Sequence, residues 1–135
     1  MTSPPPVLPE LPKRYRPWPS PERALLGQGG AATVWRVQDQ DLGVLVALKV
    51  LKTTNSRMVA RLEREAILAS RVVHPHVVPL HDIGRTPDGQ SYLAFGLASD
   101  GTLLDLSGDP PPWPILCRMI KQTLSALGAL HARGI

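Results

Sequence analysis

The feature that most constrains the fold is a glycine-rich turn that leads into a strand. The turn is Gly27-Gln28-Gly29-Gly30, and residues 32–37 after it alternate in polarity and include β-branched and aromatic side chains. Such alternation is typical of a β-strand, whereas a dinucleotide-binding turn opens directly into a helix. The sequence therefore predicts a glycine-rich hairpin. Because glycine has no side chain, the backbone N–H groups of this hairpin can approach the oxygens of a phosphate chain.

The remaining periodicity predicts an α+β fold. Residues 24–51 indicate three consecutive antiparallel strands, the last of which is almost entirely apolar, as in a strand covered on both faces. Residues 57–71 have helical spacing and follow side chains that can cap a helix. Two further strands are expected at 77–83 and 91–97, a short helix from Thr102, and a long helix over 113–133. We predict a five-stranded antiparallel sheet with one packed helix, followed by two more helices.

Composition separates the N-terminal segment from the rest. Residues 1–21 contain eight of the fifteen prolines, and they predict a flexible or polyproline-like tail. The net charge of +4 comes from scattered Lys and Arg, which does not support a nucleic-acid surface. The single cysteine, Cys117, excludes an intramolecular disulfide. No apolar run has the length of a membrane span or a signal core, so we expect a cytoplasmic protein without membrane contact.

Lys49 lies within the apolar strand and shares a face with Ala47 and Leu51. A charge buried without a partner is unfavourable, so Lys49 requires an anion. Glu65, in the apolar stripe of the next predicted helix, is the candidate, and the pair could present Lys49 to the phosphates of a nucleotide. The alternative is that Lys49 extends to water and Glu65 is a solvated helix residue.

These segments, taken in order, resemble a protein kinase. The resemblance is closest to bacterial eukaryotic-like serine/threonine kinases, and it covers residues 15–135. It rests on four motifs: Leu26-Gly27-Gln28-Gly29-Gly30-Ala31-Ala32-Thr33-Val34-Trp35, Val46-Ala47-Leu48-Lys49, Arg64-Glu65-Ala66 and His74-Pro75-His76-Val77-Val78.

The resemblance implies roles for the residues that match it. After the Pro-rich tail at 1–21, it implies an ATP-binding small lobe at 22–98, and then the hinge exit with the first helices of a second, incomplete lobe at 99–135. Phe95 would be the gatekeeper, and Glu65 would pair with Lys49. Three positions depart from the family pattern: Ala32 replaces a glycine, and Gly96-Leu97 replaces acidic and aromatic hinge residues. The implied nucleotide-binding residues are Leu26, Gly27, Gln28, Gly29, Gly30, Ala31, Ala32, Thr33, Val34, Ala47, Lys49, Gly96 and Ala98.

In the family, the final helix is followed by a catalytic loop with a His-Arg-Asp motif and by an Asp-Phe-Gly segment that binds magnesium. The chain ends instead at Leu130-His131-Ala132-Arg133-Gly134-Ile135. We therefore expect a truncated kinase that contains no catalytic residue and no metal ligand and is inactive alone. The family reaction would be transfer of the ATP γ-phosphate to protein Ser/Thr, with magnesium. The alternative is a non-catalytic module that binds nucleotide or a kinase partner.

Overall fold

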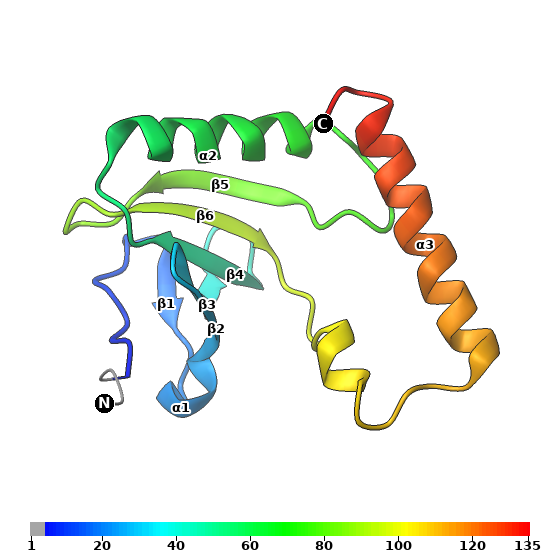
Figure 1. The fold of residues 1–135 in the computed structure, drawn as a ribbon. Coiled ribbons are helices and arrows are strands. Elements are labelled where there is room, and N and C mark those ends of the chain that lie inside the picture. The colour runs from blue at the N-terminus through cyan, green and yellow to red at the C-terminus, as the bar shows by residue number, and fades with distance from the viewer. Residues whose placement is uncertain (1–4) are drawn as a thin grey trace.

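The structure, a computed structural model, describes residues 5–135. One antiparallel sheet dominates this part of the chain, in the order β1-β3-β4-β6-β5 with β2 also paired to β3 (Figure 1). Helix α2 runs along one side of the sheet, beside β5. Helix α3 comes after the last strand in the chain and lies away from β1. The elements are β1 (Tyr15–Pro17), α1 (Pro21–Ala24), β2 (Leu25–Gln28), β3 (Ala32–Asp39), β4 (Val44–Leu51), α2 (Ser56–Ser70), β5 (Leu80–Arg85), β6 (Ser91–Gly96), the 3₁₀ helix η1 (Leu103–Leu106) and α3 (Trp113–His131).

The elements expected from periodicity are present. The five predicted strands correspond to β2 through β6, and the predicted packed helix is α2. Its first turn is capped by Asn55, whose side chain accepts hydrogen bonds from the backbone N–H groups of Arg57 and Met58 at 3.1 and 3.2 Å. Thr102 and Asp105 form the expected capping box, although the element that follows Thr102 is a single 3₁₀ turn.

The N-terminal segment differs from the prediction. Residues 1–21 were expected to be a flexible tail, but Tyr15–Pro17 form a sixth strand that pairs with β3. Tyr15 is only 3% exposed, and Leu8, Leu11 and Trp18 pack against the same core. Apolar side chains among the prolines thus bury surface that the composition alone did not indicate. Residues 1–4, which belong to the predicted tail, lie outside the described residues.

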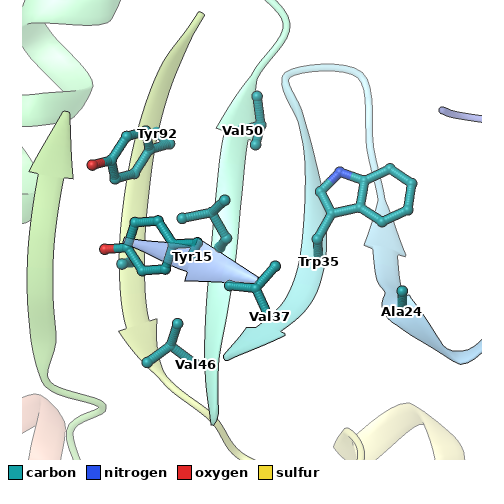
Figure 2. Packing of buried hydrophobic residues seen from close by; sticks show 9 residues of the cluster. Tyr15, Ala24, Trp35, Val37, Val46, Val50 and Tyr92 are labelled. Carbon is teal, nitrogen blue, oxygen red and sulfur yellow. The ribbon is translucent and has the colours of Figure 1, made fainter. Parts of the chain in front are cut away.

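The larger hydrophobic core covers the face of the sheet opposite α2, which we call the outer face (Figure 2). The central strands contribute Val37, Val46 and Leu48, all fully buried. Tyr15 of β1 meets Tyr92 of β6 edge to face, with ring centroids 5.6 Å apart. Since such aromatic pairs contribute beyond their buried area, they help to hold the N-terminal segment on this face.

A polar network surrounds the two tyrosines. The Tyr15 and Tyr92 hydroxyls each donate a 2.8 Å hydrogen bond to Asp82 Oδ2. Arg14 donates to both carboxylate oxygens of the fully buried Asp39, at 2.8–3.0 Å, and its Nη1 lies 3.5 Å from Asp82 Oδ2. Burial, followed by the bond to Asp82, raises the pKa of Tyr92 to about 12. The network ties β1 to three other strands.

The face toward α2 has a smaller core. It consists of Ala32, Leu51 and Val59, with Leu62 packed against it. In the second half of α2, Ile67 and Leu68 are more than 40% exposed. The helix is therefore anchored mainly through its first two turns.

Candidate nucleotide-binding site

Strand register brings four of the residues expected around the nucleotide onto one face, whereas Thr33, opposite Val50, projects to the other face. In the antiparallel ladders Val34 lies opposite Lys49, and Ala47 lies opposite Phe95. Directly opposed residues project to the same side of a sheet, and so do residues two apart in one strand. Val34, Ala47, Lys49 and Phe95 therefore share the face toward α2, which we call the inner face. The outer-face core occupies the other side.

The glycine-rich turn connects β2 to β3 at one end of this face. Gly29 N–H donates to the Ala32 carbonyl at 2.9 Å and closes the hairpin. Lys52 supports it from the end of β4, because its ammonium donates to the Gly29 carbonyl at 2.7 Å. Leu26 lies at the register shift between Leu25 and Gly27 and is 38% exposed. The hairpin expected from the sequence is present. The hydrogen bond from Lys52 to this hairpin was not predicted, because Lys52 belongs to no recognised motif.

The glycines of this turn are not required by the fold itself. None of Gly27, Gly29 and Gly30 has a positive φ. A Cβ added to any of them would meet nothing within 4 Å. Neither backbone strain nor close packing against the rest of the chain accounts for glycine at these three positions.

The predicted ion pair between Lys49 and Glu65 is not formed. Glu65 accepts a 2.9 Å hydrogen bond from Arg61 Nε, four residues earlier on α2, and its side chain is 55% exposed. The carboxylate lies on the solvent side of the helix, where the i,i+4 neighbour is the nearest cation. Among residues 5–135 Lys49 has no ion-pair partner, and the residue is half-buried. An anionic ligand on the inner face would supply the missing charge.

The hinge expected at residues 96–98 follows directly from β6. Gly96 N–H is already used, since it donates to the Pro79 carbonyl at 2.9 Å. A Cβ at Gly96 would lie 3.1 Å from the Pro79 ring, so close packing favours glycine at this position. Phe95 and Leu97 are half-buried and Ala98 is exposed, which leaves the backbone of Ala98 open to a ligand.

The described residues contain no cluster of typical metal-binding side chains. No three His, Cys, Asp or Glu side chains between positions 5 and 135 lie close enough together to hold a metal ion. His74 instead joins the segment before β5 to α3, because its Nε2 lies 3.0 Å from Ser125 Oγ, and its Nδ1 accepts a hydrogen bond from the backbone N–H of His76 at 3.1 Å. Within the described part of the chain, no helix combines the length and apolarity of a membrane span.

Comparison with known proteins identifies the family. The protein kinase domain matches residues 21–135. Over 119 residues the chain is 35% identical to the serine/threonine-protein kinase pkn3 of Myxococcus xanthus, covering 83% of this chain and 21% of that protein. Over 118 residues it is 37% identical to the serine/threonine-protein kinase PknE of Mycobacterium tuberculosis, covering 83% and 20%.

A solved structure, the crystal structure of the Mycobacterium tuberculosis PknI kinase domain, matches with a TM-score of 0.63 and 29% identity. The match covers 82% of this chain and 47% of that one. The chain thus spans about a fifth of the length of the curated relatives it matches. It has the fold of a kinase small lobe followed by two helical elements. The chain belongs to the protein kinase domain family, and its relatives pkn3 and PknE are bacterial serine/threonine kinases.

Proposed function

We propose that this chain is the ATP-binding portion of a serine/threonine protein kinase, and that it binds ATP on the inner face beneath the glycine-rich turn. The observation that carries the proposal is the alignment of Lys49 with Val34, just inside a turn whose glycines the fold does not require. Lys49 would hold phosphate oxygens as a point charge. Val34 and Ala47 would cover the adenine ring, and the backbone at 96–98 would bond its edge.

The chain's own residues support binding more than phosphoryl transfer. The aspartate that positions the acceptor hydroxyl and the aspartate and asparagine that hold magnesium in kinases have no counterpart among the 135 residues. We therefore propose that these residues alone bind ATP without transferring its γ-phosphate. Transfer to protein Ser/Thr is proposed for the whole protein, and its cytoplasmic location stays a prediction.

Calorimetric titration of the 135-residue chain with ATP tests the proposal. Lys49→Met should weaken binding roughly tenfold to a hundredfold, because a charge-assisted hydrogen bond contributes about 1.5–3 kcal/mol. Gly29→Ala should also weaken binding while leaving thermal stability unchanged or slightly raised, since its Cβ meets open space. Lys121→Met, at an exposed lysine of α3, is the matched control. Equal affinities for the Lys49 and Lys121 variants would contradict the proposal.

The apolar side chains of α3 support the second candidate, a non-catalytic module that binds a kinase partner. Ile120, Leu124 and Leu127 are 42–60% exposed, and a cavity of about 690 Å³ lies between this helix and the hinge exit. Exposed apolar stripes of this kind favour association. Magnesium-dependent phosphate transfer from ATP by the 135-residue chain, abolished by Lys49→Met, would contradict both this candidate and the proposal that these residues alone bind ATP without transfer.

A further inference from the structure

A small cavity at the N-terminal end of α2 has the character of an anion site. Its volume is about 180 Å³, enough for a tetrahedral oxyanion and a few waters, because a water takes about 30 Å³ in the liquid. The end of β4, the first turn of α2 and the turn between β5 and β6 enclose it. Leu51 and Val59, both buried, contribute its apolar part.

One buried hydroxyl in this cavity has no partner. Ser91 is 2% exposed, and its Oγ makes no hydrogen bond among the described residues. Side chains alternate along β6, so Ser91 projects away from the outer-face core that holds Tyr92 and toward α2. A buried hydroxyl without a partner is costly and indicates a missing ligand or water.

The surrounding charges favour an anion. Two cations, Lys52 and Arg85, line the cavity, together with one carboxylate, Asp88. The Asp88 carboxylate accepts a hydrogen bond from the Thr86 hydroxyl. Lys52 is committed to the Gly29 carbonyl, but Arg85 has only a 3.5 Å contact to the Gly89 carbonyl. That distance exceeds the usual range for an N–H···O hydrogen bond. The guanidinium thus keeps donors that can reach an oxyanion.

The start of α2 adds backbone donors. Asn55 accepts from Arg57 and Met58, but the N–H of Ser56, the first helical residue, has no carbonyl within the helix to bond. The positive end of the helix dipole lies at the same place. Three kinds of donor thus border one cavity: a buried hydroxyl, a guanidinium and a helix start.

We propose that this cavity binds a phosphate group, either inorganic phosphate or the phosphate monoester of a phosphorylated side chain. Ser91 would donate from beneath, Arg85 from the β5 side and the start of α2 from above. The site is separate from the proposed ATP site, since none of Val34, Ala47 and Lys49 lines it. It therefore stands whether or not the chain binds ATP.

Backbone-amide chemical shifts of the 135-residue chain, recorded during titration with sodium phosphate at constant ionic strength, test the proposal. The expected result is a saturating shift at Ser56, Arg57 and Ser91. It should persist in Lys49→Met, which removes the ammonium proposed to hold ATP. Saturation at lower concentration with a phosphoserine peptide would identify a phosphorylated side chain as the ligand, and equal or weaker peptide binding would identify free phosphate. Shifts confined to Lys49 and Gly29, or no saturation with either probe, would overturn the proposal.

Two variants sharpen the test. Arg85→Ala should weaken phosphate binding roughly tenfold, as expected for a lost charge-assisted hydrogen bond, whereas Arg118→Ala on the exposed surface of α3 should not change it. Ser91→Ala should weaken phosphate binding yet melt at the same or a higher temperature, because it removes an unpartnered hydroxyl. If Ser91 had only a structural role, the substitution would not weaken phosphate binding while leaving the melting temperature unchanged or higher. Unchanged phosphate affinity in both the Arg85 and Ser91 variants would overturn the proposal.

Discussion

Replacing Arg14 by alanine should unfold or loosen this domain far more than a surface mutation does. Arg14 makes three contacts of 2.8–3.0 Å with Asp39, whose side chain is fully buried. Without Arg14, Asp39 keeps hydrogen bonds from the backbone N–H groups of Asp41 and Leu42, at 3.0 and 3.2 Å, but loses its cation. The substitution thus leaves a buried carboxylate without a compensating charge.

The magnitude follows from the burial of the two partners. Removing one partner of a fully buried ion pair costs about 3–5 kcal/mol. The Arg14 side chain is 26% exposed, so water can partly replace it. We therefore expect a loss of about 2–3 kcal/mol, a large part of the roughly 5–15 kcal/mol that stabilises a typical domain. At 4–8 °C per kcal/mol for a domain near 100 residues, this is a decrease in Tm of roughly 8–24 °C.

Urea and thermal unfolding followed by circular dichroism would measure the loss. Arg16→Ala is the matched control, since Arg16 is an exposed arginine two residues later, in β1, and forms no ion pair within the described residues. It should change the unfolding free energy by less than about 0.5 kcal/mol. Hydrogen exchange at the backbone amides of Tyr15 and Arg16 would distinguish release of β1 from global unfolding. Equal stabilities for the two variants would refute the reasoning.

Two further predictions concern the same face. Gly84→Ala should destabilise the protein by about 1–3 kcal/mol in urea unfolding, because the new Cβ would lie 2.6 Å from the Tyr92 hydroxyl oxygen; an unchanged midpoint would mean that the ring can move aside. Stability should also fall on acidification. Hydrogen bonds from Arg14 lower the pKa of Asp39 below its ordinary value, so the ionised carboxylate stabilises the fold fully above about pH 3.9 and loses this effect as pH falls through the lower folded pKa. In urea unfolding at pH 7, 4 and 3, Asp39→Asn should show a smaller loss than the wild type, and equal losses would contradict this role.

The sequence predicted the elements whose signals are local. Alternation predicted the strands on both sides of the glycine-rich turn, and Asn55 marked the start of α2. The face shared by Ala47 and Lys49 follows from the period of two in a strand, and the register confirmed that they project to one side. The side of β4 that carries Lys49 could therefore be predicted without knowledge of the tertiary structure.

What the sequence did not predict depends on partners that are distant along the chain. The strand formed by Tyr15–Pro17 contains a proline, which does not favour a strand in the sequence. Contacts of Arg14 and Tyr15 with Asp39 and Asp82 hold it in place, and no local pattern connects these carboxylates to it. The position of Glu65 was missed for a different reason. Arg61 precedes it by four residues, so an i,i+4 pair on the solvent side competed with the longer contact to Lys49.

The hydrogen bond from Tyr15 to Asp82 spans 67 residues of sequence. In a chain made from its N-terminus, β1 is synthesised first but finds this partner only after β5 has emerged. Forming a contact between residues so distant in sequence requires closing a long loop, which costs conformational entropy before the contact can stabilise the fold. Such contacts therefore slow folding. The apolar residues of the outer face are then uncovered during much of synthesis. Closure of the N-terminal segment over them is expected to be a late step in folding, and the step at which a nascent chain is most exposed to aggregation.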